Sequence, residues 1–288
     1  MSNIFEIAIE NSNLVRQLER LNKLVSQKNI VVRHSYTSSN YDLLRLTDCA
    51  FYSWKGRGIA TDSKDFLELL ELDRFQQLID DNQLSQINKD ELERLTKLYL
   101  EAIYNLLMVA NYGAAMLRSN CYEVERKHLV MIEENIKYAL DYLNLNAKVI
   151  DEIIYLYPKE LALELLAEKQ PEDITNDMIK YLHIKTKGDL FAKKKLLTSL
   201  ARYLESYGKE YKNDADLRKL GHIFNNFDLR HNNVDEGSKN YKNQIAKLSN
   251  DELEKWYDVA FYRIVDFLIK TQIKEMEKPL PLINELMK

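Results

Sequence analysis

The stretch LSNDELEKWYDVAFYRIVDFLI, residues 248–269, decides the fold class. Ser249 followed three residues later by Glu252 is a capping-box pattern, and Leu248 and Leu253 occupy the positions of a hydrophobic staple around it. Beyond this cap, apolar residues recur at spacings i, i+3, i+4 and i+7, which predicts a long helix with one buried face. These positions are Leu253, Trp256, Tyr257, Ala260, Phe261, Ile264, Val265, Leu268 and Ile269.

A helical period extends through most of the remaining chain. Only 7 Gly and 4 Pro interrupt 288 residues, which favours long helices with short connections. Apolar residues make up 45% and charged residues 30%, a balance typical of a folded protein. We therefore expect an all-α fold. The predicted helices before the last one cover residues 3–27, 63–80, 89–117, 122–143, 147–157, 159–168, 173–183, 189–208 and 215–227.

Two segments break this pattern. Residues 29–66 contain β-branched residues, a Ser/Thr/Asn cluster and the turn Gly56-Arg57-Gly58, which indicates a short hairpin or an ordered loop near residues 30–60. The segment QPEDITND, which begins at Gln170, is polar, contains Pro171 and separates two helical blocks. We therefore predict an N-terminal helical domain over 1–170 and a C-terminal helical bundle over 171–288.

The charge and composition of the chain limit the kinds of partner and the cellular compartment that we expect. The net charge of −4 is too small to indicate a nucleic-acid or membrane surface by itself, although it leaves room for a local basic patch. The first residues, MSNIFEIAIENSN, lack the basic start of a signal peptide, and no apolar stretch approaches the ~20 residues of a membrane span. Cys49 and Cys121 show no recognisable spacing and are expected as unpaired thiols. We expect a cytoplasmic protein without membrane contact.

Common catalytic and cofactor motifs are missing from the sequence. It contains neither a GxxxxGK[ST] phosphate loop nor a strand–GxGxxG–helix unit, and its five His lack the spacing of a zinc site. We therefore expect no cofactor and no metal site.

The strongest candidate for function is GHIFNNFDLRHNNVDEG, residues 221–237. On the predicted helix 215–227, Arg218, His222 and Asn225 recur at i, i+4 and i+7 and form a polar face. The opposite face carries the apolar residues Leu217, Leu220, Phe224 and Phe227. Arg230 and His231 follow just beyond the helix end.

These residue types suit chemistry on a phosphodiester. Arginine binds phosphate through a planar fork, and histidine exchanges protons near neutral pH. The candidate catalytic residues are Arg230, His231 and His222, and the candidate substrate-binding residues are Arg218, Asn225, Asn226, Asn232 and Asn233. They predict binding of RNA, or its cleavage without metal if the 2′-hydroxyl attacks. An ordinary surface helix followed by a polar loop has the same pattern.

The order of segments over the last hundred residues resembles the HEPN superfamily. The segments are GDLFAKKKLLTSLARYLES, LRKLGHIFNNFDLRHNN and the capped LSNDELEKWYDVAFYRIVDFLI. The resemblance implies a four-helix up-and-down module of the kind found in prokaryotic toxins and abortive-infection (phage-defence) proteins. It also implies an R-x(4–6)-H motif near the start of the last helix, two copies of which meet in a homodimer and cleave RNA without metal. Arg230, followed by the polar His231, matches the first residue of that motif.

The motif is degenerate in this chain. The second residue, His, belongs at about 235 to 237, where the sequence has Asp235, Glu236 and Gly237. Three alternatives stay open. His231 or His222 replaces the absent His; the module binds a protein or RNA without chemistry; or it senses a nucleotide or RNA with phosphates held by the run 193–195, KKK. Residues 1–170 resemble no family and would bind a partner, sense a trigger or dock on the bundle.

Overall fold

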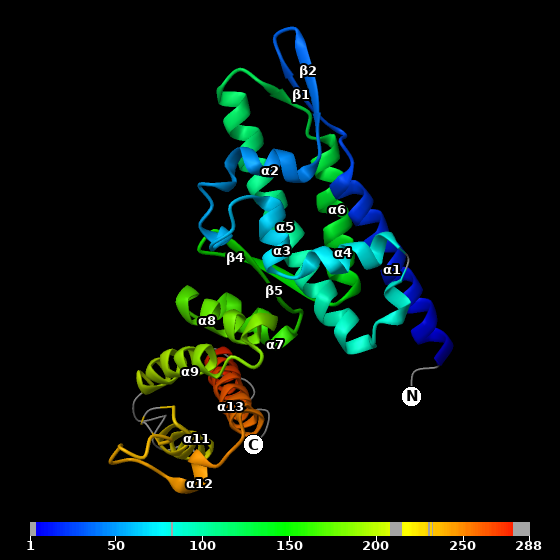
Figure 1. Ribbon diagram of the computed structural model, residues 1–288. Coiled ribbons are helices and arrows are strands. Elements are labelled where there is room, and N and C mark those ends of the chain that lie inside the picture. Colours follow the sequence, from blue (N-terminus) through cyan, green and yellow to red (C-terminus); the bar gives the residue numbers. More distant parts are fainter. Residues whose placement is uncertain (1–3, 82, 208–214, 230, 232, 279–288) are drawn as a thin grey trace, which may run out of the picture. The chain divides into compact units, whose positions relative to one another are not determined.

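The computed structural model describes residues 4–81, 83–207, 215–229, 231 and 233–278 (Figure 1). The described chain is mostly helical, as predicted, but it also contains two small antiparallel sheets. Backbone contacts divide it into two compact units, Met1–Pro158 and Lys159–Lys288. Residues 159–170, predicted to belong to the N-terminal domain, pack in the second unit because Leu166 is fully buried in its core.

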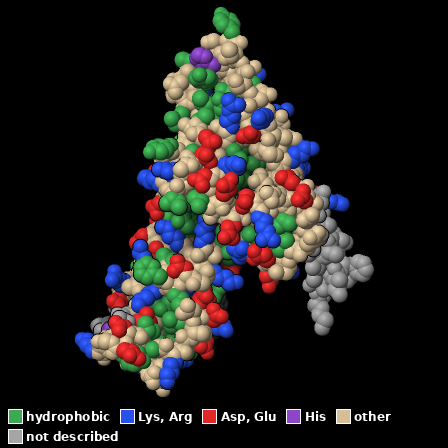
Figure 2. Space-filling model, in the orientation of Figure 1, with side chains coloured by type: hydrophobic (Ala, Val, Ile, Leu, Met, Phe, Trp, Pro, Cys, Tyr) green, Lys and Arg blue, Asp and Glu red, His purple; other side chains and the backbone are tan. Residues whose placement is uncertain are grey.

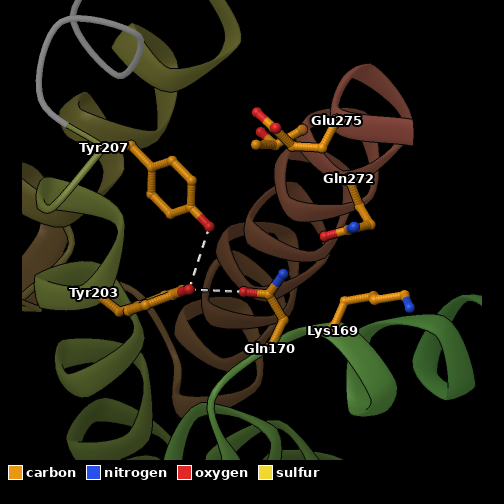
Figure 3. A pocket seen from close by; sticks show the side chains of 7 residues that line it. Lys169, Gln170, Tyr203, Tyr207, Gln272 and Glu275 are labelled. Atoms are coloured by element: carbon orange, nitrogen blue, oxygen red, sulfur yellow. Dashed lines mark hydrogen bonds between the residues drawn. The ribbon is translucent and has the colours of Figure 1, made fainter. Parts of the chain in front are cut away.

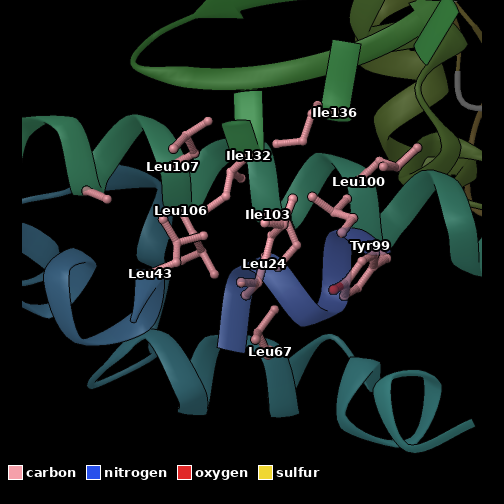
Figure 4. Packing of buried hydrophobic residues seen from close by; sticks show 14 of the residues in the cluster. Leu24, Leu43, Leu67, Tyr99, Leu100, Ile103, Leu106, Leu107, Ile132 and Ile136 are labelled. Carbon is pink, nitrogen blue, oxygen red and sulfur yellow. The ribbon is translucent and has the colours of Figure 1, made fainter. Parts of the chain in front are cut away.

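Six α-helices make up most of the first unit, and the longest of them, α5, runs through its middle (Figure 1). Helices α2, α4 and α6 all pack on α5, whose buried residues lie on several sides of the helix. Figure 4 shows Leu43, Leu67 and Ile132 converging on this helix from three others. The helices are α1 (Ile4–Ser26), α2 (Leu43–Phe51), α3 (Ser63–Leu69), α4 (Leu72–Asp80), α5 (Lys89–Ser119) and α6 (Lys127–Tyr142), with short 3₁₀ turns at Lys55–Arg57 and Leu84–Gln86.

The close approach of α2 to α5 depends on a glycine. A Cβ atom added to Gly113 would lie 2.5 Å from the carbonyl oxygen of Leu46, closer than such atoms can approach. Because the obstacle is backbone, α2 and α5 would have to separate to admit a side chain there.

The predicted hairpin near residues 30–60 is confirmed. Strand β1 (Ile30–His34) pairs antiparallel with β2 (Thr37–Tyr41), and the two-residue strand β3 (Glu123–Val124) pairs with the other side of β1. The ring of His34 stacks on Tyr122 with centroids 4.3 Å apart. This histidine therefore has a packing role next to the turn of the hairpin.

The predicted helix over 147–157 is wrong. These residues form a second hairpin of β4 (Leu145–Ile150) and β5 (Ile153–Pro158), joined at Asp151 and Glu152, which both have positive φ. Two successive positive φ angles are typical of the type I′ turn that suits hairpin twist. The β-branched and aromatic residues on either side of this turn favour strands, although a short apolar run alone does not distinguish strand from helix.

Side chains from α5 complete the hydrogen bonding of β5. The Ile154 N–H donates to Asn105 Oδ1 at 2.8 Å, and Asn105 Nδ2 donates to the Ile154 carbonyl at 3.0 Å. The Leu156 N–H donates to Glu101 Oε2 at 3.1 Å. An isolated two-stranded hairpin is marginally stable, and these buried bonds fix its outer edge to the helix.

Three smaller differences concern other helices of this unit. The predicted helix 63–80 is two helices, α3 and α4, because Glu71 adopts a left-handed conformation with φ of 57°. The predicted helix 122–143 begins later, at Lys127, since β3 occupies Glu123–Val124. Helix α2 lies in the segment expected to be irregular, and the Asp42 side chain caps it by accepting from the Arg45 N–H.

The second unit is a bundle built around the last helix. Its helices are α7 (Leu161–Lys169), α8 (Glu172–Leu182), α9 (Leu190–Glu205), α11 (Ala215–Asn226), α12 (Asn243–Ala246) and α13 (Asn250–Glu277), with a 3₁₀ turn at Ile184–Thr186. Helix α13 packs against α7, α9 and α11, and α8 packs against α9. The inward residues of α13 include Tyr257, Phe261, Ile264 and Leu268, all of which have at most 1% of their surface exposed.

The predicted start of α13 is confirmed. The Glu252 N–H donates to Ser249 Oγ, and the Ser249 N–H donates to Glu252 Oε2 at 2.9 Å, so both halves of the capping box are present. The bonds that the Ser249 N–H and the Ser249 hydroxyl donate to the Glu252 carboxylate lower the pKa of this group below its ordinary value. Trp256 lies at the edge of the apolar stripe, partly exposed, and packs on Phe227 with ring centroids 4.4 Å apart.

Candidate functional site

Helix α11 presents the polar face that its sequence predicts. Arg218, His222 and Asn225 are exposed, whereas Leu220 and Phe224 are fully buried against the bundle. Phe227, one residue beyond the helix, is half-buried against Trp256. The side chain of Leu217 lies outside the described part of the helix.

Immediately after α11, Asp228 and Asn233 close a loop. Asp228 has a positive φ of 59°, which turns the chain out of the helical direction. The Asp228 N–H donates to Asn233 Oδ1 and the Asn233 N–H donates to Asp228 Oδ1, both at 3.0 Å. Asn233 is completely buried, and its Nδ2 also donates to the carbonyl of Asn240 at 2.9 Å. The side chain proposed for substrate binding therefore holds the loop together.

Helices α9 and α13 hold the near end of this loop in place. Lys194 Nζ lies 2.8 Å from Asp228 Oδ2, and Thr198 Oγ1 donates to the carbonyl of Leu229 at 3.3 Å. Tyr257, on α13, is buried beside the same carboxylate. Burial, and then the charge of Asp228, raises the pKa of Tyr257 above its ordinary value. Asp228 is thus largely buried and paired with Lys194, which makes it a structural anchor.

A second polar group joins the end of α11 to the far side of the loop. Asn226 Nδ2 lies 3.0 Å from His222 Nδ1 and donates to the His222 carbonyl at 2.7 Å, while Lys242 Nζ donates to Asn226 Oδ1. The Lys242 N–H donates to the carbonyl of Asn233 at 2.8 Å. Because an amide nitrogen can only donate, His222 Nδ1 is the acceptor, and a neutral imidazole then carries its proton on Nε2. We call His222, Asn226 and Lys242 the His222 cluster.

The structure describes only part of the loop in which the sequence predicts Arg230, His231 and Asn232 as site residues. His231 is exposed to solvent. Arg230 and Asn232, on either side of it, lie outside the described residues. In the sequence, Asp228 stands before these three residues and Asn233 stands after them. The structure therefore describes both ends of the loop.

The basic run on α9 is largely neutralised. Lys193 is 5% exposed, and its Nζ lies 2.8 Å from Glu254 Oε1 and 2.5 Å from Asp258 Oδ1. Burial opposes the charge on Glu254, but its bonds with Lys193 and with the Gly188 N–H prevail and lower its pKa. With Lys194 paired to Asp228, Lys195 is the member of the run that is exposed.

Charges of both signs are mixed over the surface. Figure 2 shows Lys and Arg side chains interspersed with Asp and Glu over the visible face. Within the described residues, no group of three or more His, Cys, Asp and Glu side chains is placed to hold a metal ion. None of the helices in that part of the chain combines the length and apolar composition needed to cross a bilayer.

Sequence reasoning missed Asp228, Lys194 and Lys242 as partners of the predicted residues. Asp228 and Asn233 are five residues apart, a spacing that no regular helix or strand brings into contact. Lys242 is 16 residues from Asn226. No local period signals such contacts. Asp and Asn favour turns because their side chains bond to nearby backbone groups, as those of Asp228 and Asn233 do here.

Comparison of the chain with protein-family models, with curated proteins and with solved structures finds no match.

Proposed function

We propose that the chain is a HEPN-like helical protein of the bacterial phage-defence or toxin kind, and that it binds or cleaves RNA without metal around Arg230 and His231. The observation that carries the proposal is the placement of the His222 cluster. It lies exposed at the end of α11, and Lys242 connects it to the anchor that closes the Arg230 loop. An imidazole, an amide and an ammonium group therefore lie at the base of the loop that carries an arginine.

The side chains divide the chemistry between them. Arg230 binds the scissile phosphate, and Lys242 adds a second positive charge near the loop base. His222, whose Nδ1 accepts from Asn226, offers an Nε2–H to a phosphate oxygen. His231 is exposed and serves as the base that takes the proton of the attacking 2′-hydroxyl. Arg218 and Asn225 extend the binding face along α11.

Incubation with RNA tests the enzymatic form of this proposal. Purified protein and its Arg230→Ala variant are mixed with total RNA in the presence of a chelator, with Arg202→Ala as a matched control, because Arg202 is an exposed arginine on α9. We expect cleavage by the wild type and by Arg202→Ala, and loss of cleavage in Arg230→Ala. Equal cleavage by all three proteins, or none by any, overturns the assignment of an enzyme.

A non-enzymatic interaction module is the second candidate. Exposed apolar side chains on α13 favour it, since Val259, Tyr262, Ile273 and Met276 lie on one side of that helix with 40% to 59% of their surface exposed. If the protein acts by binding a partner through this face of α13, Tyr262→Glu abolishes its biological activity and Arg230→Ala leaves that activity intact. Activity that survives Tyr262→Glu but not Arg230→Ala decides for the RNA function.

The resemblance also leads us to propose a cytoplasmic homodimer, formed through the C-terminal bundle, with a protein partner or trigger bound by residues 1–170. Two copies of a degenerate motif meeting in one cleft would supply two Arg230 and two His231 side chains. The mass of the protein in solution tests the dimer, and a monomer at working concentration contradicts it.

A further inference from the structure

The C-terminal unit carries a polar pocket that is separate from the Arg230 loop. Its volume is about 360 Å³, within the range of small-molecule sites of roughly 300–1,000 Å³. The last residues of α7, the end of α9 and the last turns of α13 line it (Figure 3). Tyr257 and Gln272 are 15 residues apart on α13, so the pocket lies about 22 Å along the helix from the anchor at Asp228.

A chain of hydrogen bonds orients one wall of this pocket. Tyr203 Oη donates to Gln170 Oε1 at 2.8 Å and lies 3.2 Å from Tyr207 Oη. Since a hydroxyl has one proton, Tyr203 accepts from Tyr207. The bond from Tyr203 fixes the orientation of the Gln170 amide, whose oxygen faces Tyr203. Figure 3 shows the amide nitrogen pointing away from Tyr203. That nitrogen, on a residue that lines the pocket, is a hydrogen-bond donor.

The rim of the pocket adds one charge of each sign. Glu275, on α13, is exposed and is paired with Lys278, and Lys169, at the end of α7, is paired with Glu168 at 2.6 Å. Exposed pairs of this kind contribute little stability, so a ligand can replace them. With no net charge and several amide and hydroxyl groups, the lining suits a neutral heterocycle with hydrogen-bonding edges better than it suits an anion.

We propose that this pocket binds a guanine base, as a free nucleotide or as part of an RNA strand. The Glu275 carboxylate accepts from N1–H and from the exocyclic amino group of guanine, which present two parallel donors to a carboxylate fork. Gln170 Nε2 donates to O6, and the ring of Tyr207 forms an apolar wall for the base. Adenine is disfavoured because its N1 is an acceptor and would face the carboxylate. The choice of a nucleotide rests on the proposed RNA function and extends that function to a second site.

Binding of mononucleotides to the full chain tests the pocket. Calorimetric titration with guanosine 5′-monophosphate and with adenosine 5′-monophosphate compares the wild type with Glu275→Gln. Glu277→Gln is the matched control, since Glu277 is an exposed carboxylate in the same last turn. We expect guanosine 5′-monophosphate to bind at least tenfold more tightly than the adenosine nucleotide, and Glu275→Gln to weaken it at least tenfold while Glu277→Gln leaves it unchanged.

Two further results separate this proposal from the function at Arg230. Arg230→Ala is expected to bind guanosine 5′-monophosphate as the wild type does. No binding by the wild type at millimolar nucleotide, equal binding of both nucleotides, or equal binding by Glu275→Gln overturns the guanine pocket, even if RNA cleavage still depends on Arg230. Guanine binding that depends on Glu275 supports the pocket even if Arg230 proves to have no effect on RNA.

Discussion

Replacing Asn233 by alanine should release the loop that carries Arg230 and His231. The side chain accepts from the Asp228 N–H at 3.0 Å and donates to the Asn240 carbonyl at 2.9 Å, and it has no exposed surface. Alanine leaves both partners without their bonds inside the protein. A buried group so orphaned costs roughly 1–3 kcal/mol, and the Asn240 carbonyl, which is only partly buried, costs about 1 kcal/mol, so we expect the loop to lose about 2–4 kcal/mol of local stability.

Hydrogen exchange of individual backbone amides measures this loss. Since 1.4 kcal/mol corresponds to about a factor of ten, opening of the loop should accelerate exchange of the Asp228 and Lys242 amides by about 30- to 700-fold. Asn225→Ala is the matched control, because Asn225 is an exposed asparagine on α11, and exchange in that variant should match the wild type. Rates in Asn233→Ala within about threefold of the control would show that the reciprocal Asp228–Asn233 bonds do not hold the loop.

Three other predictions concern the framework of the two units. Asn105→Ala removes both side-chain bonds to Ile154 of β5, and we expect a loss of about 2–4 kcal/mol in urea denaturation, with fast exchange confined first to the β4–β5 hairpin. Gly113→Ala forces α2 from α5 and should cost about 1–3 kcal/mol, seen as a lower melting temperature; an unchanged value would contradict the close approach. Ser249→Ala removes the cap of α13 and should cost about 1 kcal/mol at pH 7. Because the pKa of Glu252 is lowered in the folded state, the contribution of its carboxylate is complete above the ordinary pKa of 4.5 and is lost as the pH falls through the lower folded value. The Ser249 hydroxyl also donates to Glu252 Oε2 at 2.9 Å, and Ser249→Ala removes this bond while the bond from the Ser249 N–H remains. The difference between wild type and Ser249→Ala should therefore shrink between pH 7 and pH 3, and a difference that grows in acid would contradict this assignment.

Local signals in the sequence predicted those parts of the fold that depend on neighbours in the chain. The capping box at Ser249 and Glu252 and the polar face of α11 involve residues three to seven apart, and both are present. The hairpin at Ile30–Tyr41 followed from its β-branched and turn-forming residues. Short-range chemistry of this kind survives in the folded chain because tertiary packing agrees with it.

The features of the fold and of the site that the sequence did not predict depend on contacts between residues far apart in the chain. The apolar run of the second hairpin predicts a helix as readily as a strand, and the residue that fixes it, Asn105, lies 49 residues from Ile154. At the candidate site, Arg218, His222 and Asn225 were placed correctly on the exposed face, but the burial of Asn233 was not foreseen. That burial depends on Asp228 and Asn240, which meet Asn233 only when the loop closes.

Binding of single-stranded RNA is the measurement that tests the central claim most directly, because it covers both catalytic and non-catalytic forms of the site. Fluorescence anisotropy with a labelled RNA compares wild type, Arg230→Ala and the control Arg202→Ala over a range of salt concentrations. If Arg230 contacts a phosphate, its removal should weaken binding and reduce the salt dependence by about one phosphate contact, while Arg202→Ala changes neither. Equal affinity and equal salt dependence in all three proteins would contradict the assignment of the Arg230 loop as the RNA site.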